Sequence, residues 1–130
     1  MTNDELKTMV LDYMAEGYLE NIIDMFKHDE TLYPLVIDMI SDERVRVRLG
    51  GAALVEELVK IDSAPFVKII PDIALLLEDS NPTLRGDAAY LLGLIRHADA
   101  IPYLLKAKDD NNVFAREIIV DAIHDITGNN

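Results

Sequence analysis

Apolar residues recur along this chain at helical spacing, and they keep the same register three times. They stand three, four, seven and ten positions after each of three arginines, which defines one stripe of an α-helix. The arginines are Arg48, Arg85 and Arg116, and the stripes comprise Gly51, Ala52, Val55 and Leu58; Ala88, Ala89, Leu92 and Ile95; and Ile119, Val120, Ile123 and Ile126. Another apolar run precedes each arginine. The pattern therefore predicts three pairs of helices and no β-structure.

Each predicted pair also carries a proline, an aspartate eight positions later and an arginine six positions after that. The three sets are Pro34, Asp42 and Arg48; Pro71, Asp79 and Arg85; and Pro102, Asp110 and Arg116. Proline suits the first turn of a helix, where its missing N–H is no loss. The aspartate falls in the turn, where it can accept hydrogen bonds from the N–H groups that open the second helix. We expect the arginines and aspartates to form a structural ladder between successive units.

A unit that recurs in this way predicts an all-α fold, an α-α superhelix or solenoid. The first helices, expected at 3–15 and 18–27 and separated by Gly17, lack the three-residue signature. We interpret residues 1–30 as a degenerate helical pair that caps the stack. The three repeats follow at 31–60, 61–97 and 98–130, within a single domain of 130 residues. Six extra residues stand in the 61–69 segment, and the helix expected at 63–78 should break near Pro71.

The repeats resemble those of the HEAT repeat family, and more closely the short HEAT-like, phycobilin-lyase-type repeats of bacterial and archaeal proteins. The phrases that carry the resemblance are Val47-Arg48-x-x-Gly-Ala-Ala and Leu84-Arg85-x-x-Ala-Ala-x-x-Leu-Gly, within about residues 31–127. Ile119 and Val120 depart from the small residues usual there, which fits a terminal repeat. The resemblance implies an armadillo-type solenoid whose second helices line a concave binding face.

Composition narrows the class of partner. The chain has 24 acidic and 12 basic side chains, a net charge of −12, and an acidic surface repels nucleic-acid phosphates. It has no cysteine, which excludes disulfides and thiolate chemistry. No apolar run approaches the roughly 20 residues of a membrane span, and the acidic first residues do not resemble a signal peptide. We expect a cytoplasmic protein that binds neither nucleic acid nor membrane.

Catalytic signatures are missing from the sequence, and we expect neither an enzyme nor a bound cofactor. The one set of side chains with metal-ligand character is Glu117, Asp121, His124 and Asp125, which share a helical face. Because acidic residues are common in this chain, we interpret this set as a solvent-exposed helix face and not as a group of metal ligands. We therefore predict no metal site.

A docking surface is the favoured functional hypothesis. The outward stripe of the second helices contains Gly50, Gly86 and Gly93, and glycine inside a helix costs about 1 kcal/mol relative to alanine. Either a partner packs over these glycines, or they serve packing between helices. On the first interpretation, a basic or amphipathic protein segment docks on Tyr90 and Leu94 as apolar anchors, with Glu57, Asp87 and Asp121 supplying charge complementarity.

Two other functions stay open at this point. The resemblance to phycobilin-lyase-type repeats implies a chaperone- or lyase-like factor that handles a cofactor or chromoprotein. The second alternative is a structural protein that self-associates into a homo-oligomer. Its contact would be the acidic N-terminal pair or an exposed end of the solenoid.

Overall fold

All regular structure in the computed structural model, which describes residues 1–128, is helical, and no strand occurs in that range. The predicted all-α class is confirmed. The chain divides into two compact units, Met1–Asp62 and a second that begins at Ser63.

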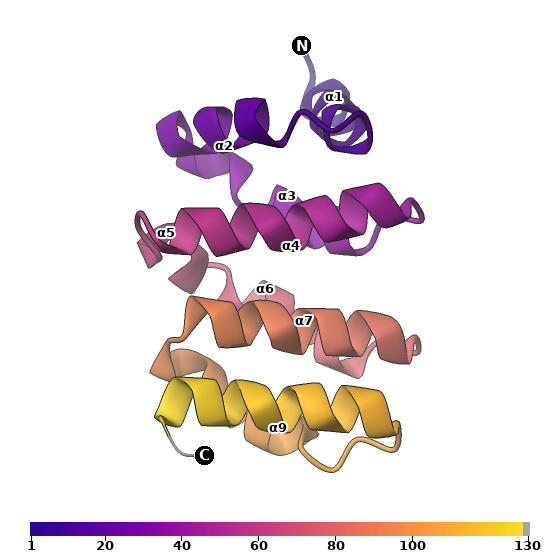
Figure 1. Cartoon of the computed structure of the whole chain (residues 1–130), viewed down its shortest axis with the longest axis vertical. Helices are drawn as coiled ribbons and strands as arrows, with labels where there is room; N and C mark the ends of the chain where they lie inside the picture. Colours follow the sequence, from indigo (N-terminus) through magenta and orange to yellow (C-terminus); the bar gives the residue numbers. More distant parts are fainter. Residues whose placement is uncertain (129–130) are drawn as a thin grey trace. The chain divides into compact units, whose positions relative to one another are not determined.

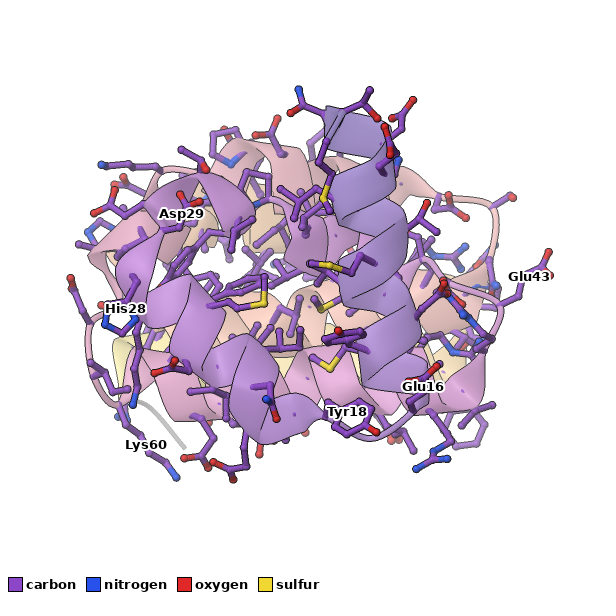
Figure 2. All side chains as sticks on the ribbon, turned by 90° about the horizontal axis from the view of Figure 1, so that it is seen from above. Glu16, Tyr18, His28, Asp29, Glu43 and Lys60 are labelled. Atoms are coloured by element: carbon purple, nitrogen blue, oxygen red, sulfur yellow. The ribbon has the colours of Figure 1, made fainter. Side chains whose placement is uncertain are left out.

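The first unit is built around one long helix. Its elements are α1 (Asn3–Ala15), α2 (Leu19–His28), the 3-10 helix η1 (Glu30–Leu32), α3 (Leu35–Ile40) and α4 (Val45–Val59). Helix α4 packs against α1, α2 and α3 (Figure 1). Figure 2 looks onto α1 and α2, with Tyr18 in the turn between them and His28 at the far end of α2.

Local signals in the sequence set both ends of α1. Thr2 and Glu5 form a reciprocal capping box, in which each side-chain oxygen accepts the other residue's backbone N–H at 3.1 Å. After the helix, Gly17 adopts a φ of 91°, a conformation that glycine enters without steric cost. The Tyr18 N–H then bonds to the carbonyl of Tyr13 at 3.0 Å. The predicted helix 3–15 and its glycine stop are confirmed.

Two adjacent glycines let α4 approach its neighbours closely. A Cβ added to Gly51 would lie 2.8 Å from the Cβ of Met39 on α3, and one added to Gly50 would lie 3.1 Å from the Sδ of Met14 on α1. The Cβ–Cβ distance is shorter than van der Waals contact allows, so α3 can pack here only because position 51 has no side chain. Helix α2 contributes Phe26 to the core of this unit, where its ring centroid lies 5.4 Å from that of Tyr33.

The second unit has two layers of helices. Its elements are α5 (Ala64–Val67), α6 (Ile70–Leu75), η2 (Leu76–Glu78), α7 (Pro82–Ile95), η3 (Ala98–Ala100), α8 (Ile101–Ala107) and α9 (Val113–Thr127). Helices α7 and α9 lie side by side as one layer, and α6 and α8 pack behind them as the other (Figure 1). The core comprises mainly aliphatic side chains: Ile70, Ile73, Leu91, Leu92, Leu104 and Ile119 are fully buried.

The first helix of each pair is shorter and more broken than predicted. The helix expected at 63–78 is split into α5, α6 and η2, with Pro71 in the first turn of α6, so the predicted break is confirmed. The helix expected at 31–40 is also interrupted: η1 ends at Leu32, and Pro34 is the N-cap of α3. Proline cannot donate the backbone hydrogen bond that would continue the preceding turn, which explains why the helix restarts there.

Candidate functional site

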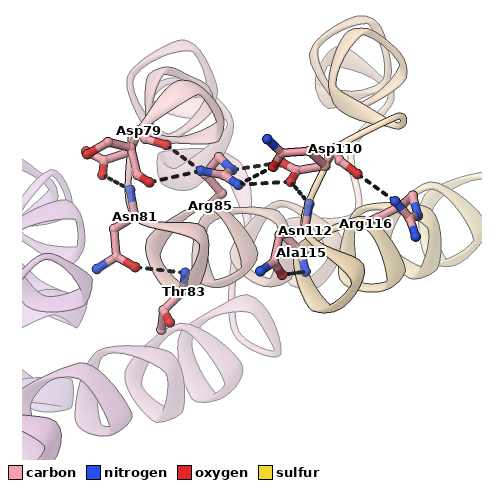
Figure 3. Close-up of polar contacts among 10 residues, drawn as sticks. Asp79, Asn81, Thr83, Arg85, Asp110, Asn112, Ala115 and Arg116 are labelled. Carbon is pink, nitrogen blue, oxygen red and sulfur yellow. Dashed lines mark hydrogen bonds and ion pairs between the residues drawn. The ribbon is translucent and has the colours of Figure 1, made fainter.

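The turns that open α7 and α9 have the same hydrogen bonds. The Oδ1 atoms of Asp79 and Asp110 accept the backbone N–H two residues later, from Asn81 and Asn112, each at 2.9 Å. Both asparagines are N-caps, whose Oδ1 atoms accept from the N–H of Thr83 at 2.9 Å and of Ala115 at 3.0 Å (Figure 3). Each turn thus satisfies backbone donors at the start of its helix with two side chains.

Arg85 joins these two turns. Its Nη1 donates to the carbonyl of Asp79 at 2.8 Å, while Nε and Nη2 donate to the two carboxylate oxygens of Asp110 at 2.8 and 3.0 Å (Figure 3). The bidentate geometry matches the planar guanidinium fork. Only 13% of the Arg85 side chain and 7% of the Asp110 side chain are exposed, so water screens this pair weakly.

The Arg85–Asp110 pair stabilises the charged form of both groups. The hydrogen bond from Arg85 holds the pKa of the Asp110 carboxyl below its ordinary value, although burial acts in the opposite direction. In turn, the hydrogen bond to Asp110 raises the pKa of Arg85. Both groups are therefore ionised at neutral pH, and their role here is to hold two turns together.

The other two repeat arginines also bind their own turns. Nη1 of Arg48 donates to the carbonyls of Asp42 and Glu43, both at 2.8 Å. Nη1 of Arg116 donates to the carbonyl of Asp110 at 2.9 Å. Within residues 1–128 no carboxylate lies within ion-pair distance of Arg116. The arginine-to-turn bond is thus common to all three repeats.

Arg44 has a role that the sequence did not suggest. Its guanidinium binds both oxygens of Asp42, at 3.0 and 3.1 Å, and also Oδ1 of Asp12 on α1 at 2.8 Å. The hydrogen bond from Arg44 lowers the pKa of the Asp42 carboxyl. The two-residue spacing between Asp42 and Arg44 could have predicted their contact, because it is local. The contact between Arg44 and Asp12 depends on how α1 packs, so the sequence could not predict it.

The glycines of α7 lie between helices and not on an open surface. A Cβ added to Gly93 would lie 3.3 Å from both Cα and Cβ of Ala122, and one added to Gly86 would lie 3.0 Å from Cδ1 of Ile118. Both glycines are buried, so the expectation of an exposed glycine patch in this unit is wrong. The alternative interpretation, packing between helices, accounts for them.

The predicted docking residues belong to both units. Tyr90 is exposed on α7, where Asp87 and Leu94 are half-buried, and Asp121 is exposed on α9. Glu57 belongs to α4 in the first unit, where its Oε1 lies 3.2 Å from Nζ of Lys60. The second unit therefore carries an aromatic side chain and carboxylates on the layer formed by α7 and α9.

Two of the three histidines have local structural contacts. Nδ1 of His28 lies 2.8 Å from the carbonyl of Asp24, and Nδ1 of His97 accepts the N–H of Asp99 at 3.0 Å. No group of three or more His, Asp or Glu side chains among residues 1–128 is arranged to hold a metal ion. In the same residues, no helix combines the length and apolar character needed to cross a membrane.

A groove lies in the layer formed by α6 and α8, and the sequence reasoning missed it. Its volume is about 370 Å³, and it is lined by Pro71, Ala74, Leu75, Leu77, Glu78, Tyr103, Lys106, Ala107, Asp109 and Asp110. Leu75 and Tyr103 are exposed although they stand in apolar helical runs. Such runs predict a buried face, and no periodicity in the sequence identifies which of their members remain exposed.

No protein-family model matches this chain, and a search of curated proteins finds no significantly similar sequence.

Proposed function

We propose that this protein is a non-enzymatic interaction module built as a short HEAT-like solenoid. The observation that carries the proposal is the repeated turn. Arg48, Arg85 and Arg116 each donate to the carbonyl of the aspartate six residues earlier, at 2.8–2.9 Å. Three equivalent turns at the sequence positions of the HEAT-like signature support a stack of equivalent helix pairs.

The polar side chains of the turns have structural roles, which limits the residues left for recognition. Asp79, Asp110 and Arg85 cap helices and connect turns, so they are engaged in structure and not in chemistry. The surface that remains for recognition on α7 and α9 has an exposed Tyr90 and an exposed Asp121. Tyrosine is enriched among residues that dominate binding energy at interfaces.

The proposed partner is a protein segment that is basic or amphipathic. Tyr90 and Leu94 act as apolar anchors, and Asp87 and Asp121 attract the cationic side of the segment. Glu57, the other carboxylate predicted to attract the segment, belongs to the first unit. The net charge of −12 favours encounter with a cationic partner at low ionic strength.

Affinity capture from native cell lysate at low and at high salt tests this function. We expect a specific partner that is lost at high salt and lost from the double variant Tyr90→Ala/Asp87→Lys. The matched control is Tyr18→Ala/Asp24→Lys, which alters an exposed tyrosine and an exposed aspartate in the first unit. Unchanged capture by the α7 variant, or equal loss from the control, contradicts the proposed face. Concentration-dependent light scattering without any captured partner would favour self-association instead.

A further inference from the structure

The groove between α6 and α8 has apolar walls that remain open to solvent. Leu75 on α6 is 66% exposed and Tyr103 on α8 is 40% exposed, and Ala74 and Ala107 line the space near them. Burying a leucine-sized side chain is worth about 1.5–3 kcal/mol, so these exposed walls can contribute binding energy that folding leaves unused. A hollow of about 370 Å³ is large enough for one bulky side chain and its neighbours.

The rim of the groove is acidic. Glu78 is paired across it with Lys106, at 3.6 Å between Oε1 and Nζ, and Asp110 is already bound by Arg85. That leaves Asp109 as the lining carboxylate with no cation within ion-pair distance among residues 1–128. The lining residues carry three carboxylates and one ammonium group, so the charge complementary to this rim is positive.

We propose that this groove is a second docking site, which binds a protein segment with one large apolar side chain next to a cationic residue. The apolar side chain lies against Leu75 and Tyr103, and the cation faces Asp109. The groove belongs to the layer of α6 and α8, whereas Tyr90 lies on α7 in the other layer (Figure 1). The site is therefore independent of the face in the proposed function and would allow two segments to bind at once.

Titration of the full-length ¹⁵N-labelled protein with short synthetic peptides tests the site. One peptide has a tryptophan flanked by arginines; a second replaces the arginines with glutamates, and a third replaces the tryptophan with serine. We expect the first peptide alone to shift the amide signals of the groove, namely those of Ala74, Leu75, Tyr103, Ala107 and Asp109. The glutamate peptide controls for the charge requirement, and the serine peptide controls for non-specific attraction to an acidic protein.

Single variants separate the apolar contribution to peptide binding from the electrostatic one. Leu75→Gln should weaken binding of the arginine–tryptophan peptide about tenfold, because it removes apolar contact area. Asp109→Asn should weaken it about threefold, as expected for an exposed ion pair. The matched control is Leu105→Gln, since Leu105 is an exposed leucine of α8 that does not line the groove. All three side chains are at the surface, so thermal unfolding of each variant should stay close to that of the unaltered protein.

Several outcomes would overturn the second site. They are equal binding of the glutamate peptide, an unaltered affinity in Leu75→Gln, or amide shifts that map to α7 and α9. Concentration-dependent shifts at the groove without peptide would make a second copy of the chain its occupant. The double variant Tyr90→Ala/Asp87→Lys should bind the peptide normally, so failure of the α7 face in lysate capture and failure of the groove are separate results.

Discussion

The turns before α7 and α9 have the same local structure, but their arginines differ in partners. Both turns have an aspartate that accepts from an asparagine N–H, an asparagine N-cap and an arginine that donates to the aspartate carbonyl. Arg85 additionally binds the Asp110 carboxylate, whereas the described residues offer no such carboxylate to Arg116. One aspartate can thus serve its own helix through Oδ1 and the preceding repeat through both oxygens, and only the second role depends on a neighbouring repeat.

The helices that follow these turns also differ, in the size of the residues at two equivalent positions. At the positions one and eight residues after the arginine, α7 has Gly86 and Gly93, both buried against α9. At the same positions, α9 has Glu117, which is exposed, and His124, which is half-buried. The pair of glycines allows α9 to pack closely on α7. The difference shows that α7 has no side chain where α9 covers it, whereas α9 has larger polar side chains at the same repeat positions.

The largest effect should come from filling the space between α7 and α9. We expect Gly93→Leu to destabilise the fold by about 3 kcal/mol, because overpacking a close contact with backbone forces the helices apart. The residue at the same repeat position of α9 is the control: His124→Leu should change stability by about 0.5 kcal/mol or less. Urea unfolding followed by circular dichroism measures both. Similar losses in the two variants would contradict a special requirement for glycine at position 93.

A smaller effect should distinguish the two arginines. Removing the carboxylate in Asp110→Ala should cost about 2 kcal/mol, because charged, poorly exposed hydrogen bonds are lost and Arg85 remains without its partner. Arg85→Met should lower the thermal midpoint more than Arg116→Met, since of these two arginines only Arg85 binds a carboxylate among the described residues. The double variant Arg85→Met/Asp110→Ala should recover part of the summed loss. Strict additivity, or equal effects of the two arginine variants, would contradict a ladder between these turns.

The smallest effect concerns pH. Arg85 lowers the pKa of the Asp110 carboxyl in the folded state, so the unfolded state takes up that proton first as the pH falls. The stabilisation that the ionised Asp110 gives the folded state is complete above the unfolded pKa of about 4. It is lost as the pH falls through the lower pKa of the folded state. The difference in unfolding free energy between the unaltered protein and Asp110→Asn should therefore be constant from about pH 5 to 8 and narrow below about pH 4.

The control for this pH dependence removes its cause. In an Arg85→Met background, the effect of Asp110→Asn should change much less with pH, because the hydrogen bond that shifts the carboxyl is absent. Chemical denaturation at closely spaced pH values provides the measurement. A difference that narrows equally in both backgrounds would show that other groups, such as the Asn112 N–H and Arg116, lower the pKa of Asp110, and that Arg85 does not.

The sequence by itself determined the helices and their turns, because these depend on neighbours within a few residues. The stripe that follows Arg85 predicted α7. Asp79 and Gly17 predicted a turn that opens a helix and a helix end, and the structure contains both. Such signals are local: a capping hydrogen bond or a positive φ needs no contact with the rest of the fold.

Tertiary packing decided the features that join distant segments. Asp12 meets Arg44 only because α1 packs on α4, and Gly93 is buried only because Ala122 lies against it. The groove beside Leu75 likewise exists because α6 and α8 leave space between side chains that look equally apolar in the sequence. Helical periodicity identifies which face of a helix is apolar. Which part of that face is covered depends on the distance and angle of the next helix, and residue spacing along one helix does not contain that information.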